Sequence, residues 1–199
     1  TPTSRPSGPA FHTPGYADGM STGRPRATSR ETIAEAACEL FLERGYVDTT
    51  VAEITRRAGV SRSSFFNYFG SKADVLWGGF DERLDAAVAA LGAAAPVRTA
   101  LQGLVAGFAP DSLALAITNA EAMGIAGDLD DERALRTGRL ARAASDRLLA
   151  EGALRLEADV RAGAAASAVL AAVWSWASGP GRRDLCEVLD EALAAASVA

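Results

Sequence analysis

Hydrophobic residues between positions 29 and 90 recur at intervals of three and four, as they do along one face of a helix. A serine or threonine precedes each of these segments and a glycine follows the first three, which is the usual order of N-caps and helix ends. The pattern predicts four helices, at about 29–45, 50–59, 61–70 and 71–90, the last two capped by Ser61 and Ser71.

Beyond Pro96 the chain becomes rich in alanine and leucine, and proline and glycine divide it into longer segments. No segment alternates between apolar and polar residues as a strand would. We therefore expect an all-α protein. The five further helices are expected at about 97–108, 111–123, 130–151, 158–178 and 182–197, with Asp130-Asp131-Glu132 as the acidic first turn of one of them.

Composition supports a helical protein and limits its partners. Of the 199 residues 49% are hydrophobic, and many of these are alanine, the strongest helix former. The net charge of −5 argues against a protein coated in basic residues, but it permits a local basic face. No apolar run approaches the ~18 residues of a membrane span, so we expect no membrane partner and a cytoplasmic location.

The residues available for catalysis or metal binding are few. Cys38 and Cys186 lie far apart, and there is no CxxC pair, so both are interpreted as structural thiols. The single histidine, His12, lies in a segment rich in proline, glycine and serine. We therefore predict no metal site, no cofactor and no catalytic residue.

Residues 1–28 contain five prolines among serine, threonine and glycine, and we expect this arm to be disordered. Met20 is a candidate translation start, in which case residues 1–19 are an upstream extension. Arg24-Pro25-Arg26 is either a solubilising segment or an extension that reaches phosphates or the minor groove of DNA.

The segment GVSRSSFFNYFGSK, residues 59–72, has the pattern of the second half of a helix-turn-helix. Phe65 and Phe69 are four residues apart and so share a face, which we expect to anchor the helix to its neighbours. The other faces would then be free to enter the major groove of DNA. Arginine pairs with guanine, asparagine with adenine, and an aromatic ring contacts the thymine methyl.

Several residues are therefore candidates for DNA contact. Lys72 is the only lysine of the chain, and it lies at the start of the fourth helix, where a cation is unfavourable unless a phosphate is bound beside it. The hydroxyl of Tyr68 can also reach a phosphate. The predicted DNA-binding residues are Thr50, Arg62, Ser63, Ser64, Phe66, Asn67, Tyr68 and Lys72.

Two stretches, AACELFLERGYVDTTVAEITRRAGVS and SSFFNYFGSKADVL, resemble the DNA-binding domain of the TetR family of transcriptional regulators. Thr55, where the family has a small apolar residue, and Asn67, where it is often aromatic, depart from the pattern. The resemblance implies a homodimeric repressor that binds a palindromic operator and is released by a small ligand. After the arm at 1–28, it also implies a helix-turn-helix domain (29–78) and a helical effector-binding and dimerisation domain (79–199).

The resemblance further implies a ligand pocket in the C-terminal helices and a pairing surface on the last two. The apolar excess there indicates an apolar or amphipathic effector. The candidate pocket residues are Trp77, Phe80, Leu101, Leu104, Phe108, Ile117, Asn119, Met123 and Arg147. The candidate dimer residues are Val169, Val173, Trp176, Leu185, Leu189 and Leu193, with filling of the monomer core as the alternative.

The stretch DVLWGGFDERLDA, residues 74–86, is similar to the regulator type associated with mycofactocin gene clusters, which senses acyl-CoA esters. Two other classes of function are alternatives: a small helical enzyme, and a helix-turn-helix module that binds proteins without DNA. The enzyme lacks a catalytic motif. The arginines gather in the arm and around the helix-turn-helix, whereas the first helix carries acids on one face, and this asymmetry favours DNA over a protein partner.

Overall fold

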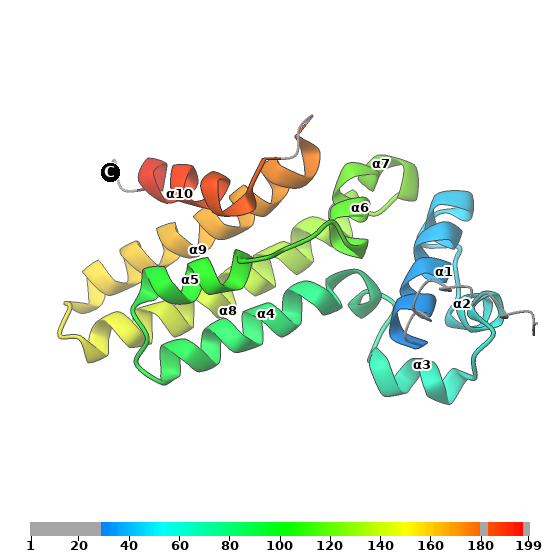
Figure 1. Cartoon of the computed structure of the whole chain (residues 1–199), viewed down its shortest axis with the longest axis horizontal. Helices are drawn as coiled ribbons and strands as arrows, with labels where there is room; N and C mark the ends of the chain where they lie inside the picture. The colour runs from blue at the N-terminus through cyan, green and yellow to red at the C-terminus, as the bar shows by residue number, and fades with distance from the viewer. Residues whose placement is uncertain (1–28, 180–182, 197–199) are drawn as a thin grey trace, which may run out of the picture.

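The computed structural model describes residues 29–179 and 183–196, and these form helices joined by short connections (Figure 1). The first three helices are α1 (Ser29–Arg44), α2 (Val51–Ala58) and α3 (Arg62–Tyr68). They pack against one another at one end of the molecule. We call these three helices the head.

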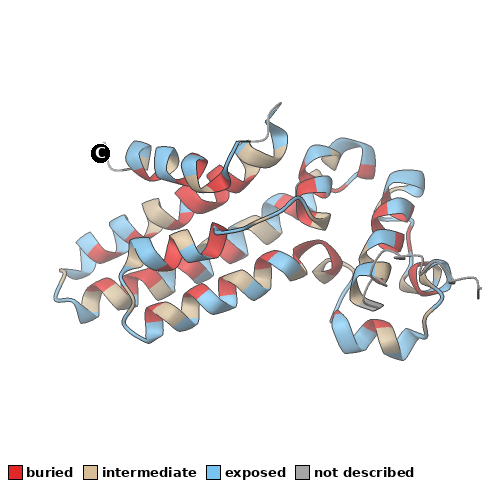
Figure 2. Ribbon diagram, viewed as in Figure 1, coloured by how far each residue is buried: buried red, intermediate tan, exposed pale blue. Residues whose placement is uncertain are grey.

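The other helices form an elongated layered bundle, which we call the body (Figure 1). They are α4 (Asp74–Gly92), α5 (Val97–Val105), α6 (Ser112–Thr118), α7 (Ala120–Met123), α8 (Ala126–Ala150), α9 (Arg155–Ser178) and α10 (Leu185–Ala196). Helix α9 packs along α8 and is covered by α10, and α4 contacts α5, α6 and α8. The buried residues follow the facing sides of these helices (Figure 2). The predicted all-α class is confirmed, and no strand occurs in the described ranges.

Helix ends in the head follow the cap residues of the sequence. The hydroxyl of Thr50 accepts a hydrogen bond from the Glu53 N–H while the Glu53 carboxylate accepts one from the Thr50 N–H, which completes a capping box at α2. Ser61 caps α3 by accepting from the Ser64 N–H at 3.0 Å. Gly59, with φ of +67°, ends α2 in the left-handed conformation that glycine adopts without strain.

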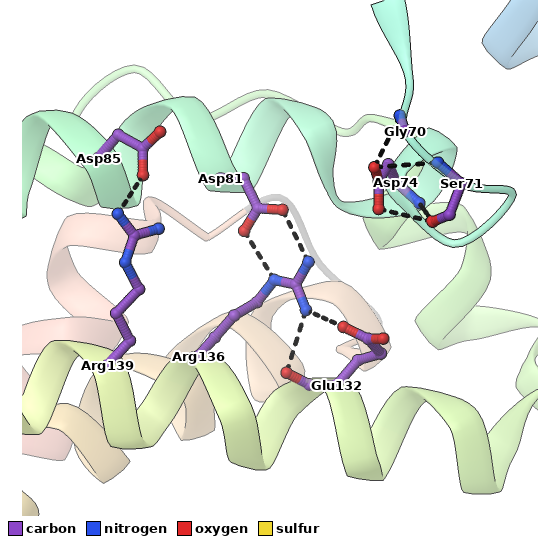
Figure 3. Close-up of polar contacts among 8 residues, drawn as sticks. All are labelled: Gly70, Ser71, Asp74, Asp81, Asp85, Glu132, Arg136 and Arg139. Carbon is purple, nitrogen blue, oxygen red and sulfur yellow. Dashed lines mark hydrogen bonds and ion pairs between the residues drawn. The ribbon is translucent and has the colours of Figure 1, made fainter. Parts of the chain in front are cut away.

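Helix α4 begins at Asp74, three residues after the predicted cap, yet Ser71 still contributes to its start. The Ser71 hydroxyl accepts from the Asp74 N–H at 3.2 Å (Figure 3). The Asp74 carboxylate in turn accepts from the N–H groups of Gly70 and Ser71, at 2.9 and 3.1 Å. This reciprocal arrangement satisfies donors that a helix N-terminus otherwise leaves without a partner.

Two predicted boundaries in the body are wrong. The single helix expected at 111–123 is divided at Asn119, whose side-chain amide donates to the Leu115 carbonyl at 2.9 Å and whose backbone (φ −115°, ψ 22°) is not helical. A side chain that bonds to nearby backbone groups competes with the helical ladder, and this explains the break. Helix α8 begins at Ala126, so Asp130-Asp131-Glu132 lies inside it rather than in its first turn.

We expected no apolar run long enough to span a membrane, but helix α9 is long and apolar enough to do so by length and composition alone. In this structure it lies between α8 and α10, and its buried residues include Val169, Leu170 and Val173. A core helix of a bundle has the same length and composition, so these properties are explained by packing.

Candidate nucleic-acid interface and body cavity

Helix α3 has two faces of opposite character. Phe65 and Phe69 are buried, with 0% and 3% of their surface exposed, and their ring centroids lie 5.5 Å apart. Phe66 and Tyr68 are each 46% exposed. The face that carries the two buried rings therefore fixes α3 to the head, and the opposite face is available for contact with another molecule.

The available face of α3 also carries polar groups. Arg62, Ser63 and Asn67 are exposed, and the Arg62 guanidinium carbon lies 5.6 Å from the centroid of the Phe66 ring. Stacking of this kind limits the conformations of an exposed arginine. Ser64 is half-buried, and its hydroxyl lies 2.8 Å from that of Ser61, so it belongs to the helix cap more than to the surface.

Much of the positive charge around the helix-turn-helix is neutralised within the head. Arg57 bonds to Glu43 at 2.7 Å and to Glu39 at 3.1 Å, both on α1, and Arg44 pairs with Glu53. The hydrogen bond from Arg57 lowers the pKa of the Glu43 carboxyl. The acids of the first helix therefore hold α2 rather than form a purely solvated face.

Lys72 makes contacts inside the chain that the sequence did not predict. Its ammonium donates to the carbonyls of Tyr46 and Thr49 and lies 4.0 Å from the centroid of the Tyr46 ring. Burial lowers the pKa of this ammonium. Two of its three protons are thus used inside the chain. The carbonyls of the α1–α2 connection therefore offer a structural reason for a lysine at this position, beside the predicted phosphate contact.

Thr50 and Thr55 are both engaged in helix structure. Thr50 is exposed at the start of α2, but its hydroxyl takes part in the capping box and donates to Glu53 at 2.9 Å. The Thr55 hydroxyl donates back to the Ala52 carbonyl at 3.1 Å. The polar atom of Thr55 is therefore satisfied although the residue is buried.

The head is joined to the body through contacts of α1 with α4, α6 and α7. The Tyr46 N–H donates to the Met123 carbonyl at 2.7 Å, and Arg30 on α1 pairs with Glu82 on α4. A Cβ at Gly78 would overlap the Arg30 guanidinium, so the absence of a side chain there lets the arginine reach α4. This close approach explains one of the two adjacent glycines in residues 74–86.

Trp77 packs beneath a partly buried ion pair. Arg136 on α8 binds Asp81 on α4 through two bonds of 2.7 Å and also pairs with Glu132 (Figure 3). The Arg136 guanidinium lies 4.0 Å from the centroid of the Trp77 ring, and Trp77 is 1% exposed. Sequence reasoning did not identify Arg136, because its partner Asp81 lies 55 residues away.

The body contains one large cavity, of about 1070 Å³, among the described residues. It lies between the α5–α6 connection, α6, the end of α9 and the start of α10. The lining consists of Val105, Ala106, Gly107, Phe108, Pro110, Asp111, Ala114, Leu115, Thr118, Asn119, Trp176, Ala177, Gly179, Arg183, Asp184, Leu185 and Cys186. These residues come from two segments, 105–119 and 176–186, that lie far apart in the sequence, so no sequence motif could have located the cavity.

The predicted pocket residues separate into three groups. Phe108 and Asn119 line the cavity. Arg147 lies elsewhere, where it donates to the Ala95 carbonyl at 3.1 Å and pairs with Glu151. The remainder are buried in the core and do not line the cavity: Trp77, Phe80, Leu101, Leu104, Ile117 and Met123.

The predicted dimer residues face the interior of the monomer. Val169, Val173 and Leu189 are fully buried, and Leu193 is 8% exposed. Trp176 and Leu185 line the cavity. Apolar residues of α9 that do reach the surface are Leu156 and Val160, at 78% and 61% exposure. Helix α9 packs against α8 and α10, and α10 packs against α9 and α5.

The thiols and carboxylates do not assemble a metal site in the described part of the chain. Cys38 is buried, and burial raises the pKa of its thiol to about 11. Cys186 lies at the cavity lining, and burial raises its pKa as well. Neither thiol is therefore activated for nucleophilic attack.

Comparison with known proteins places the head in a family. Residues 33–76 match the model of the bacterial regulatory proteins of the tetR family. The head of this chain is a TetR-family domain. The match includes the helix-turn-helix and the first turn of α4, and it ends before the cavity-bearing part of the body.

Relatives of the TetR domain are bacterial transcriptional regulators. A mycofactocin biosynthesis transcriptional regulator, MftR, of Mycobacterium tuberculosis is 40% identical over 62 residues, which are 31% of each chain. The regulator BetI of Rhizobium meliloti is 35% identical over 95 residues, or 43% of this chain and 47% of that protein. The chain therefore spans less than half of these relatives' own length in each match.

Solved structures extend the likeness beyond the TetR domain. The TetR-family transcriptional repressor FadR of Thermus thermophilus, in complex with lauroyl-CoA, is 27% identical, with a TM-score of 0.50 over 84% of this chain and 92% of that one. The dihydroxyacetone kinase operon activator DhaS, at 14% identity, has a TM-score of 0.54 over 84% of this chain. The arrangement of head and body is therefore the fold of TetR-family regulators.

Proposed function

We propose that this protein is a sequence-specific DNA-binding transcriptional regulator, a repressor that leaves its operator when a small ligand binds the body. The observation that carries the proposal is the division of α3 into a buried face, with Phe65 and Phe69, and an exposed face, with Arg62, Phe66 and Asn67. A helix anchored on one side and exposed on the other can enter the major groove of DNA.

Within this proposal each exposed residue of α3 has its own task. Arg62 pairs with guanine, Asn67 with adenine, and Phe66 contacts a thymine methyl. Tyr68 and Ser63 reach phosphates. Lys72 acts indirectly, by holding the α1–α2 connection through the carbonyls of Tyr46 and Thr49.

The regulator acts as a homodimer, which imposes twofold symmetry on the operator. The buried positions of Val169, Val173 and Leu189 direct this proposal to the exposed faces of α9 and α10. Leu156 and Val160 are four residues apart on α9 and exposed, so they lie on one face that a second copy would cover. Val160→Glu, compared with Glu157→Gln on the same helix, tests this face. Light scattering should find that only Val160→Glu gives a monomer.

We assign residues 29–78 to DNA reading and residues 79–199 to effector binding and pairing, with residues 1–28 as an arm. The arm, including Arg24 and Arg26, lies outside the described residues. The effector is apolar or of acyl type. Support comes from the lauroyl-CoA complex of the Thermus repressor and from the local match to MftR. Since the related proteins are transcriptional regulators, we propose a cytoplasmic regulator without enzymatic activity.

Selection of bound sequences from a random duplex pool, followed by footprinting, tests the proposed function. The expected result is a palindromic site whose affinity falls steeply with salt concentration, because phosphate contacts release counterions. Arg62→Ala and Asn67→Ala should each cost about 1–3 kcal/mol and relax the preference at one base position. An asymmetric or sequence-independent footprint would contradict the proposal.

A further inference from the structure

We propose that the cavity between the α5–α6 connection and the start of α10 binds an uncharged amphiphile, and that Arg83 transmits this binding to α4. The inference rests on the proposed function, since its consequence is a change in operator affinity. It assigns the effector to a definite place, a chemical class and a route toward the head.

The walls of the cavity are mostly apolar. Val105, Phe108, Leu115 and Leu185 contribute hydrocarbon and aromatic surface, and Trp176 packs edge-on against Phe108 with centroids 5.5 Å apart. A volume of about 1070 Å³ is at the upper end of the range for small-molecule sites. An alkyl chain buried here gains about 0.8 kcal/mol per CH₂ group.

The charges at the cavity decide the head group of the ligand. Among the described residues that line it, the charged ones are Asp111, Asp184 and Arg183. Arg183 is paired with Glu191 on α10, so its charge is already neutralised. A ligand carboxylate in the cavity would therefore meet like charge, whereas an uncharged donor such as a hydroxyl is accepted.

Arg83 joins one wall of this cavity to α4. Its guanidinium donates to three carbonyls at the end of α5 and in the following turn, those of Leu104 at 3.3 Å, Ala106 at 2.8 Å and Gly107 at 3.1 Å. The same guanidinium lies 5.2 Å from the centroid of the Phe108 ring. A ligand that displaces Phe108 therefore displaces groups that a single side chain of α4 holds.

A second contact joins the same wall to the preceding turn of α4. Asp111 caps α6 by accepting from the N–H groups of Leu113 and Ala114, at 3.0 and 3.2 Å. A Cβ at Gly79 would lie 2.8 Å from the Asp111 carboxylate, so α4 and the cavity wall touch where glycine leaves no side chain. This contact explains the second glycine of the adjacent pair.

The part of α4 that meets the cavity wall also meets the head. Glu82, the neighbour of Arg83, pairs with Arg30 of α1, and Gly78, the neighbour of Gly79, makes room for the same arginine. Displacement of this turn therefore changes contacts on both sides. A ligand affects operator affinity only if it binds one arrangement of α4 better than the other.

Two probes with the same chain test the site, 1-decanol and decanoate. The full chain is titrated with each while tryptophan fluorescence and operator affinity are recorded. Trp176 is the tryptophan that lines the cavity, so Trp176→Phe should abolish the fluorescence change and retain release of the operator. We expect decanol to weaken operator binding about tenfold and decanoate to have little effect at the same concentration.

Arg83→Ala tests the transmission. Decanol should still change the fluorescence of Trp176, but operator affinity should change less than about twofold. Arg83→Lys keeps the charge and cannot bond three carbonyls in the same geometry, so decanol should weaken its operator binding less than that of the original protein. This variant tests the role of Arg83 even if the alanine variant folds poorly. Arg139→Ala is the matched control, because Arg139 pairs with Asp85 of α4 without lining the cavity. It should keep full coupling.

The outcomes separate the inference from the function on which it rests. A ligand-free protein that binds no operator refutes the proposed function. If the protein binds the operator but neither probe changes its tryptophan fluorescence or its operator affinity, the proposed ligand site in the cavity is refuted. Decanoate as effective as decanol refutes the charge argument, and normal release of Arg83→Ala by decanol refutes the role of Arg83.

Discussion

The buried ion pair between Asp81 on α4 and Arg136 on α8 should contribute far more to stability than the exposed pair Asp85–Arg139, which joins the same two helices (Figure 3). The perturbations are Asp81→Asn, Arg136→Met and the double variant, with Asp85→Asn, Arg139→Met and their double variant as the matched control. Each set forms a double-mutant cycle, and its interaction free energy isolates one pair.

The expected magnitudes follow from exposure and geometry. The side chain of Arg136 is 11% exposed, and removal of Asp81 leaves it with Glu132 and the Trp77 ring as partners. Loss of one partner of a fully buried pair costs about 3–5 kcal/mol. Because the Asp81 side chain is 31% exposed and can be partly hydrated, we expect Asp81→Asn to lower the free energy of unfolding by less, about 2–3 kcal/mol. Arg139 and Asp85 are 50% and 62% exposed, so their coupling should be about 0.2–1 kcal/mol.

The assay is urea unfolding of all seven proteins at neutral pH, at low salt and in 1 M NaCl. Screening at 1 M salt shortens the Debye length to about 3 Å, which should remove the coupling of the exposed pair and leave most of that of the buried pair. Equal coupling energies for the two cycles, or a coupling of the buried pair that disappears in salt, would refute the reasoning. A stabilised Arg136→Met variant would show that desolvation of the guanidinium outweighs its bonds.

Three further predictions concern single positions. Phe65→Ala should destabilise the protein by about 3–5 kcal/mol in urea unfolding, because Phe65 is fully buried. Phe66→Ala should leave stability nearly unchanged and weaken operator binding. Equal destabilisation by both would mean that the two faces of α3 are misassigned. Gly103→Ala in α5, where a Cβ meets nothing within 4 Å, should raise the melting temperature by the equivalent of about 0.5–1 kcal/mol, and Gly79→Ala should fail to do so. The thiol pKa of Cys38 is about 11 in the folded state and 9.0 for the free group, so the unfolded state loses its proton first and stability should fall as the pH rises between these values. In alkaline unfolding, Cys38→Ala should lack that decrease.

The sequence was sufficient for the local structure of the head. Glycine at residues 45 and 59, Thr50 with Glu53, and Ser61 act through groups within a few residues of themselves, so their signals can be recognised without a tertiary fold. The four-residue interval between Phe65 and Phe69 likewise fixes which face of α3 is buried, whatever lies beneath it.

The sequence did not settle the body, because its apolar residues have the same pattern whether they line a cavity, fill a core or form an interface. Leu101 and Leu104 are buried in the core, and Trp176 and Leu185 line the cavity. Asn119 was also ambiguous, since its bond to the Leu115 carbonyl, which divides the predicted helix, depends on a rotamer.

The helical class, the caps and the two faces of α3 can thus be predicted from the sequence, because all of them depend on short-range backbone geometry. The tertiary structure alone decided the partners of the charged groups. Lys72 bonds to carbonyls of the α1–α2 connection, and Arg83 and Arg136 have partners 21 and 55 residues away. Such pairings depend on which helices pack side by side, and burial of apolar surface along whole helices determines that packing.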